Sequence, residues 1–116
     1  MDLNYGIFFI TAPDKETAEK IAKGLIEARL AACVNITSVA SVYRWEEKIE
    51  QAEEFLLIAK SRLGLYSEIA EYVRQNHPHE VPEVIGFPIF AGSTKYLDWL
   101  GASTQIAKEI LSLGEG

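Results

Sequence analysis

Hydrophobic and polar positions recur along the chain with two periods, and these periods predict its secondary structure. Residues 6–11 form a short apolar run rich in β-forming residues, which predicts a buried strand ending before Pro13. Apolar residues then recur at helical spacing, and Asp14 is placed to cap the start of that helix. The apolar positions are Ala18, Ile21, Ala22, Leu25, Ile26 and Leu30. We therefore expect one helix face to pack on a sheet.

A β-rich alternation starts at Cys33 and predicts a long hairpin. We expect its strands at about residues 39–49 and 51–62, with polar residues around the tip. Both would be longer than the roughly 5–6 residues of a typical strand. The segment 55–59 has no polar side, which indicates a central strand.

The second half of the chain repeats the alternation of helix and strand. Apolar positions between 66 and 73 predict a second amphipathic helix, which Asn76-His77-Pro78 should end. Residues 84–90 predict a strand, and the proline within it favours a sheet edge or a bulge. A short helical turn at 96–100 and a C-terminal helix over 106–111 complete the prediction.

The predicted order, β-α-β-β-α-β, is that of an α+β ferredoxin-like sandwich, in which two helices cover one face of an antiparallel sheet. We expect one such domain over residues 1–116. The opposite face of the sheet would stay open, and the overhanging hairpin would offer unpaired strand edges. A homo-oligomer is therefore expected, because copies of the chain can cover both features.

Composition narrows the possible partners. Of 116 residues, 48% are hydrophobic and 24% charged, which is typical of a folded globular chain. The formal net charge is −6 and the Lys and Arg residues are dispersed, so we expect no nucleic-acid partner. No apolar stretch approaches the roughly 20 residues that span a bilayer, so we expect no membrane partner. The single cysteine and the lack of signal-peptide features predict a cytoplasmic protein.

Both histidines lie in one run bracketed by prolines, His77-Pro78-His79-Glu80-Val81-Pro82-Glu83. Imidazole and carboxylate groups bind divalent cations, so His77, His79 and Glu80 are candidate ligands. We expect the side chains of His77 and His79, two residues apart in an extended segment, to point to opposite faces. We therefore do not expect the two histidines to hold one ion together, unless Pro78 forces a turn. Local hydrogen bonds at a helix end are the alternative role.

Other groups carry two interpretations each. Cys33 is either a small buried residue or a thiolate ligand for copper or zinc. Tyr43, Arg44 and Trp45 either line a cleft or pack in a subunit interface. Motifs of nucleotide binding and of nucleophilic catalysis are missing, and a Cys33–His77 dyad would lack an orienting third group. We therefore expect a protein that is not an enzyme.

Five strings in order resemble the CutA-like divalent-cation-tolerance proteins. They are Thr11-Ala12-Pro13-Asp14, the segments 29–36 and 42–49, the run 77–83, and Tyr96-Leu97-Asp98-Trp99-Leu100. This resemblance implies a ferredoxin-like subunit in a tight homotrimer, with hairpins pairing between subunits. It also implies a role in tolerance to copper and other divalent cations. The trimer is similar to PII-type signalling proteins, which bind nucleotides in clefts between subunits.

Three positions depart from the family pattern. His79 stands where the family usually has Tyr, and Glu47 stands where a Gly usually follows Trp-Glu, so a turn that favours positive φ should be reshaped. Ile10 stands where some members have a cysteine proposed as a copper ligand.

Together these observations predict a trimeric, non-enzymatic divalent-cation protein. We expect Cys33, His77, His79 and Glu80 as ligands, with copper as the first choice of metal and zinc as the second. The alternative is a PII-like module that binds a small ligand in intersubunit clefts. A trimer without any ligand is a third interpretation.

Overall fold

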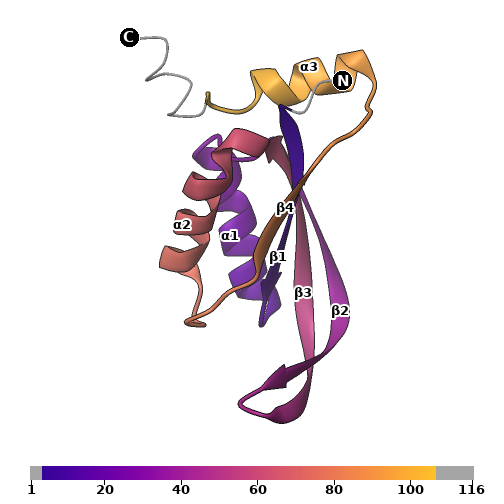
Figure 1. Cartoon of the computed structure of the whole chain (residues 1–116). Helices are drawn as coiled ribbons and strands as arrows, with labels where there is room; N and C mark the ends of the chain where they lie inside the picture. The colour runs from indigo at the N-terminus through magenta and orange to yellow at the C-terminus, as the bar shows by residue number, and fades with distance from the viewer. Residues whose placement is uncertain (1–3, 107–116) are drawn as a thin grey trace.

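The computed structural model describes residues 4–106, and Figure 1 shows their arrangement. These residues form an antiparallel sheet of four strands in the order β2-β3-β1-β4. The predicted β-α-β-β-α-β order is confirmed. In chain order the elements are β1 (Tyr5–Ala12), α1 (Lys15–Glu27), β2 (Cys33–Trp45), β3 (Lys48–Arg62), a 3₁₀ turn (Leu63–Leu65), α2 (Tyr66–Asn76), β4 (Val84–Pro88) and α3 (Thr94–Ala102).

The core lies between the sheet and helices α1 and α2. In the antiparallel register Phe8 lies opposite Ala59 and Ile10 lies opposite Leu57, so these four side chains share one face. All four are fully buried. The core side chains that the helices add are Ala18, Ile21, Leu25, Ile69 and Val73. Their spacing places them on the faces of α1 and α2 that the apolar pattern predicted.

Helix α1 begins and ends with residues that explain its bounds. The Asp14 carboxylate accepts a hydrogen bond from the Thr17 N–H at 2.7 Å, which confirms the predicted cap. The helix ends at Glu27, and Arg29 has a φ of 58°. Leu30 is therefore buried from the turn after the helix, and Ile26 is 41% exposed, so the prediction of one helical face up to Leu30 was wrong.

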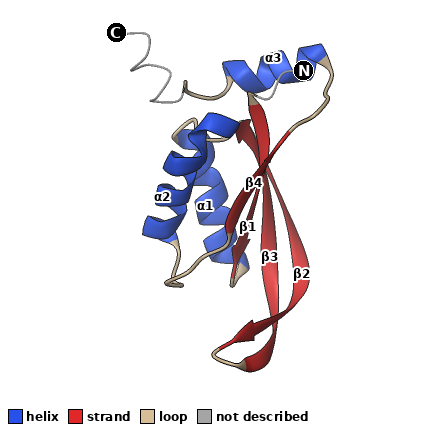
Figure 2. Ribbon diagram, viewed as in Figure 1, coloured by secondary structure: helices blue, strands red, loops and turns tan. Residues whose placement is uncertain are grey.

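The second face of the sheet is apolar and open. Helices α1 and α2 lie on one side of the sheet, and α3 lies across its end (Figure 2). The register places Ile7 and Phe9 on the open face, opposite Phe87 and Ile85 respectively. The rings of Phe9 and Phe87 meet edge to face, 5.1 Å apart. Ile85 is 52% exposed and Phe87 is 38% exposed, so this face presents apolar area to its surroundings.

The hairpin of β2 and β3 extends well beyond the rest of the sheet. Phe55 pairs with both Ala12 and Ser38, so residues 39–54 form a ribbon of two strands only. Figure 1 shows this ribbon curling away below β1. The predicted long hairpin is confirmed, but its predicted strand bounds were wrong. The chain turns at Glu46 and Glu47, and Ile49 already belongs to β3.

The hairpin turn keeps positive φ values without glycine. Glu46 and Glu47 have φ values of 50° and 65°, the left-handed conformation at both central positions of a two-residue turn. The expectation that Glu47 would reshape the turn was therefore wrong. The right-handed twist of the two strands requires this turn, so the glutamates adopt it at a cost in strain.

The remaining elements follow the prediction with shorter bounds. Helix α2 ends at Asn76 as predicted, because Pro78 cannot continue it. Strand β4 is an edge strand that ends at Pro88, so its predicted extension to residue 90 was wrong. Pro88 provides no N–H to lengthen the ladder. The helix predicted over 106–111 lies almost wholly outside the described residues. Among those described, no helix is long and apolar enough to span a membrane.

Candidate functional site

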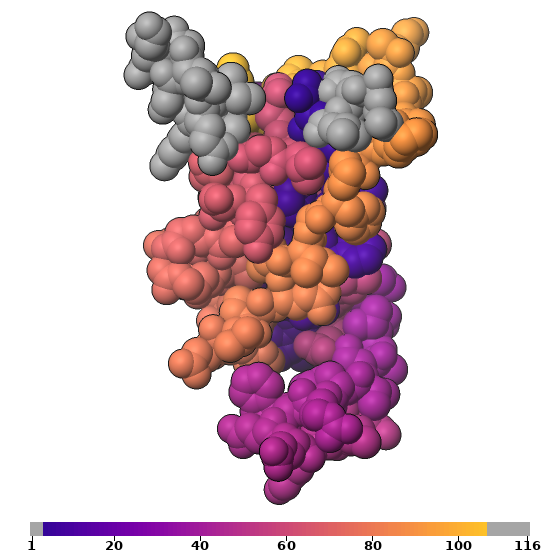
Figure 3. Space-filling model, in the orientation of Figure 1, coloured from indigo at the N-terminus to yellow at the C-terminus, as the bar shows by residue number. Residues whose placement is uncertain are grey.

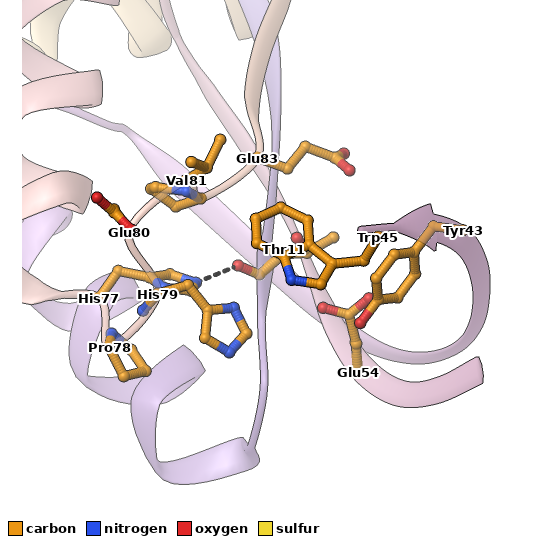
Figure 4. Close-up of a pocket in the computed structure, with 11 residues that line it drawn as sticks. Thr11, Tyr43, Trp45, Glu54, His77, Pro78, His79, Glu80, Val81 and Glu83 are labelled. Atoms are coloured by element: carbon orange, nitrogen blue, oxygen red, sulfur yellow. Dashed lines mark hydrogen bonds between the residues drawn. The ribbon is translucent and has the colours of Figure 1, made fainter. Parts of the chain in front are cut away.

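A cleft of about 490 Å³ lies between the hairpin ribbon and the segment 77–83 that follows α2. Figure 3 shows it as a hollow above the purple hairpin tip, and Figure 4 shows the side chains around it. The lining residues come from three parts of the chain that are far apart in sequence. They are Thr11, Tyr43, Trp45, Glu54, His77, Pro78, His79, Glu80, Val81, Pro82 and Glu83. The proline-bracketed run thus forms one wall.

His77 fastens that wall to the sheet. Its Nε2 atom lies 2.8 Å from the carbonyl oxygen of Thr11, and its Nδ1 atom accepts the backbone N–H of His79 at 3.0 Å. An Nδ1 atom that accepts is unprotonated, so Nε2 carries the hydrogen and donates it to Thr11. Both ring nitrogens of His77 therefore make local hydrogen bonds at the end of α2. A metal ion would have to replace one of them.

The two histidine rings lie side by side, so the expectation that they point to opposite faces was wrong. Their centroids are 5.0 Å apart and their planes are inclined by 57°. Residues two apart in an extended segment share a face, so the expectation misapplied strand alternation. The turn at Pro78 also folds the N–H of His79 back onto the ring of His77. The ring of His79 points into the cleft (Figure 4). Among residues 4–106, its nitrogens have no hydrogen-bond partner.

The hairpin supplies the opposite wall. Trp45 and Tyr43 are two apart in β2, and Glu54 lies opposite Val39, so strand alternation places all three on one face of the ribbon. The curl of the ribbon turns that face toward the segment 77–83 (Figure 4). Sequence reasoning left Tyr43 and Trp45 between cleft and interface, since no local signal reveals the curl. Sequence reasoning missed Thr11, which lines the cleft and whose backbone carbonyl is the partner of His77 Nε2.

The charge of the cleft has one sign. Its lining includes the carboxylates of Glu54, Glu80 and Glu83 and contains no Lys or Arg. In Figure 4, Glu54 lies beside the two aromatic rings, Glu83 lies on the Trp45 side, and Glu80 lies at the other end. Such a site attracts cations and repels phosphates. Within residues 4–106, however, no three His, Cys, Asp or Glu side chains lie close enough together to hold a metal ion.

Cys33 lies in another part of the subunit. It faces Lys60 on the open side of the sheet, whereas Thr11 faces Leu56. These two β3 positions are about 13 Å apart at about 3.3 Å per residue. The Cys33 thiol lies 3.8 Å from the side-chain oxygen of Asn35, which also accepts from Lys60. His77, His79 and Glu80 thus line one cleft, without forming a three-ligand cluster among residues 4–106, and Cys33 lies outside that cleft.

Tyr96 of α3 shares the surroundings of Cys33. Burial raises the pKa of the Tyr96 phenol, and the negative charge that Cys33 carries as a thiolate raises it further. This neighbourhood contains a lysine and a tyrosine and differs in character from the acidic cleft.

Comparison with known proteins decides the family. The model of the "CutA1 divalent ion tolerance protein" family matches residues 6–103. The chain belongs to the CutA1 family. The five strings that indicated CutA-like proteins all lie within the matched residues.

Individual CutA proteins agree in sequence and in fold. The chain is 45% identical to the chloroplastic protein CutA of Arabidopsis thaliana over 100 residues, which cover 85% of this chain. It is 42% identical to the divalent-cation tolerance protein CutA of Thermus thermophilus over 99 residues, covering 84% of this chain and 96% of that protein. The crystal structure of CutA1 from Oryza sativa matches with a TM-score of 0.87 and 42% identity, over 90% of this chain and 97% of the other.

The comparisons also limit what is transferred from the CutA1 family. The match spans 55% of the Arabidopsis protein, about half its length. The family is named for tolerance of divalent cations and not for an enzymatic activity. The relatives' names place them in different compartments, such as the chloroplast of Arabidopsis and, for the Archaeoglobus fulgidus protein, the periplasm. The cytoplasmic location of this chain therefore stays a prediction.

Proposed function

We propose that this chain acts in divalent-cation tolerance as a non-enzymatic homotrimer that binds the ions itself, copper first and zinc second. One observation carries the proposal: two imidazoles and three carboxylates line a cleft that contains no Lys or Arg. A cleft of this charge concentrates cations and lets them approach the ligand atoms.

The trimer is supported by the two features that a single subunit leaves uncovered. Ile85 and Phe87 present an apolar face, and the ribbon 39–54 has free hydrogen-bonding groups along its edges. Burying apolar area stabilises by about 25 cal/mol per Å², so contact between such faces favours assembly. Copies of the same chain offer each other the same apolar face and the same free strand edges.

The proposed ligands divide into two groups. His79 and Glu80 lie in the cleft, and His77 joins them when its ring exchanges one hydrogen bond for a metal. Cys33 lies on the open face of the sheet, so it joins the set only through contact between subunits. Imidazole and thiolate ligands favour copper and zinc over magnesium and calcium, which prefer oxygen.

Titration calorimetry with Cu²⁺ and Zn²⁺ tests this function. We expect the double variant His79→Ala, Glu80→Gln to bind Cu²⁺ more weakly than the wild type. Cys33→Ser should weaken it independently if the trimer brings the thiol to the ions. Unchanged Cu²⁺ binding after replacement of all four proposed ligands would show that the site is elsewhere. Absence of binding to the wild type would refute the function.

A second function is favoured by the size of the cleft. A volume of about 490 Å³ is far larger than one ion needs and lies in the range of small-molecule sites, roughly 300–1,000 Å³. Aromatic walls from Tyr43 and Trp45 are also typical of such sites. The second candidate is therefore a PII-like module that binds a small ligand and transmits the signal to a partner protein.

A further inference from the structure

We infer that the small ligand of this cleft is an organic cation, with an ammonium group held between the Trp45 and Tyr43 rings and the carboxylate of Glu54. The inference rests on the small-ligand function proposed above and names the chemical class of its ligand. It excludes the nucleotides that PII-type proteins bind, because their phosphates are anions.

The first step concerns the three carboxylates. Glu54 comes from β3, whereas Glu80 and Glu83 come from the segment after α2, so the negative charges surround the cleft from two sides. They do not converge closely enough, with the histidines, to form a cluster for one metal ion in the described chain. Charges spread over a volume of about 490 Å³ match a larger cation, whose positive groups are separated by carbon atoms.

The second step concerns the aromatic wall. Trp45 is 51% exposed and Tyr43 is 44% exposed, so their ring faces are available to a ligand. The faces of aromatic rings attract ammonium groups, and tryptophan attracts them most strongly. Glu54 lies next to both rings in Figure 4. An ammonium group placed there would gain the ring faces and a carboxylate together.

The third step concerns the remaining contacts of such a ligand. The unpartnered ring of His79 points into the same space, where it can accept a hydrogen bond from an ammonium N–H. Val81 and Pro82 add apolar surface for the carbon chain. Lys48 lies opposite Trp45 across the hairpin but does not line the cleft. The cleft thus offers acceptors, ring faces and apolar contact, but no cationic side chain for a phosphate.

Tryptophan fluorescence gives a direct test. The chain has two tryptophans, so the Trp99→Phe variant reports on Trp45 alone. We expect spermidine and tetraethylammonium, added in the presence of EDTA, to change its fluorescence with saturation below about 1 mM. ADP and inorganic phosphate should produce no change. Circular dichroism of each variant verifies that it is folded.

Matched variants locate the site. Glu54→Gln should weaken spermidine binding about fivefold or more, and Trp45→Leu, followed by calorimetry, should weaken it about threefold or more. Glu53→Gln removes the same charge one residue away, on the opposite face of the ribbon, and should change the affinity by less than about twofold. Equal losses in Glu54→Gln and Glu53→Gln, or none in Trp45→Leu, would overturn the site.

The outcomes separate this inference from the functions on which it depends. Binding of ADP without binding of spermidine or tetraethylammonium would overturn the inference that the ligand is an organic cation. The proposed small-ligand module would remain in place. Binding of neither class would overturn both. Because EDTA removes metal ions, Cu²⁺ titrations of the same protein decide the divalent-cation function independently.

Discussion

The Nε2 atom of His77 lies 2.8 Å from the carbonyl oxygen of Thr11. This hydrogen bond joins the end of α2 to the C-terminal end of β1. The two residues are 66 positions apart in sequence. Because the other ring nitrogen accepts the N–H of His79, the imidazole holds both the sheet and the following loop. The acidic wall of the cleft is therefore positioned by the imidazole of His77.

Replacing His77 should destabilise the protein more than replacing its neighbour. His77→Ala leaves the Thr11 carbonyl and the His79 N–H without their partner, so we expect the free energy of unfolding to fall by about 1–3 kcal/mol. His79→Ala removes an exposed ring that makes no side-chain hydrogen bond within residues 4–106, and should change it by less than about 0.5 kcal/mol. Urea denaturation at one protein concentration measures both. Equal effects would contradict the anchoring role.

The hairpin turn predicts a stabilising substitution. Glu47 has a φ of 65°, which glycine adopts without steric cost and glutamate does not. We expect Glu47→Gly to raise the free energy of unfolding by about 1 kcal/mol. Glu50→Gly, three residues further in β3, has no such strain to relieve and should lower it by roughly 0.5–1 kcal/mol. If both substitutions lower the melting temperature, the left-handed turn is not strained.

The order of elements was predictable because each apolar pattern agrees with its neighbours. The spacing of Ile21 and Leu25 specified the buried face of α1, and the run from Phe55 to Ala59 specified a central strand. Turn chemistry was less readable. Glutamates rarely adopt positive φ, so only the resemblance, through the family's Gly position at Glu47, indicated a turn at Glu46 and Glu47.

The site was predictable only on one side. The run 77–83 identified itself by residue type, and its prolines indicated a rigid segment. The opposite wall depends on how far the ribbon that carries Trp45 curls, which is a property of strand twist over many residues. The hydrogen bond between His77 and Thr11 uses a backbone carbonyl, which every residue has, so no pattern of residue types predicts it. Cys33 was grouped with His77 because both residue types bind copper and zinc, but the fold places Cys33 outside the cleft.

Asp14 should make stability depend on pH in a narrow acidic window. Hydrogen bonds from Thr17 hold the pKa of this carboxyl below its ordinary value of 3.8, and His77 contributes a smaller effect of the same sign. A carboxyl with a lowered pKa in the folded state stabilises it above pH 3.8, and this contribution is lost as the pH falls through the folded pKa.

Asp14→Asn provides the matched control, because asparagine caps a helix but does not titrate. We expect the melting temperature of the wild type, relative to Asp14→Asn, to be constant above about pH 5 and to fall below about pH 4. Asp14→Ala should melt lower than either at neutral pH. A wild-type advantage that grows on acidification would contradict the sign of the shift.

The open face of the sheet predicts which substitution dissociates the proposed trimer. Phe87 is 38% exposed on that face, and Ile26 is 41% exposed on the side that the helices cover. A buried, unpaired carboxylate is strongly unfavourable, so Phe87→Glu should disrupt an interface there while Ile26→Glu leaves it intact. Light scattering should give the wild type and Ile26→Glu a mass near three times the 12.9 kDa subunit, and Phe87→Glu a lower mass. A wild-type mass of 12.9 kDa at micromolar concentration would refute the trimer. Dissociation of Ile26→Glu alone would instead place the interface on the helical side.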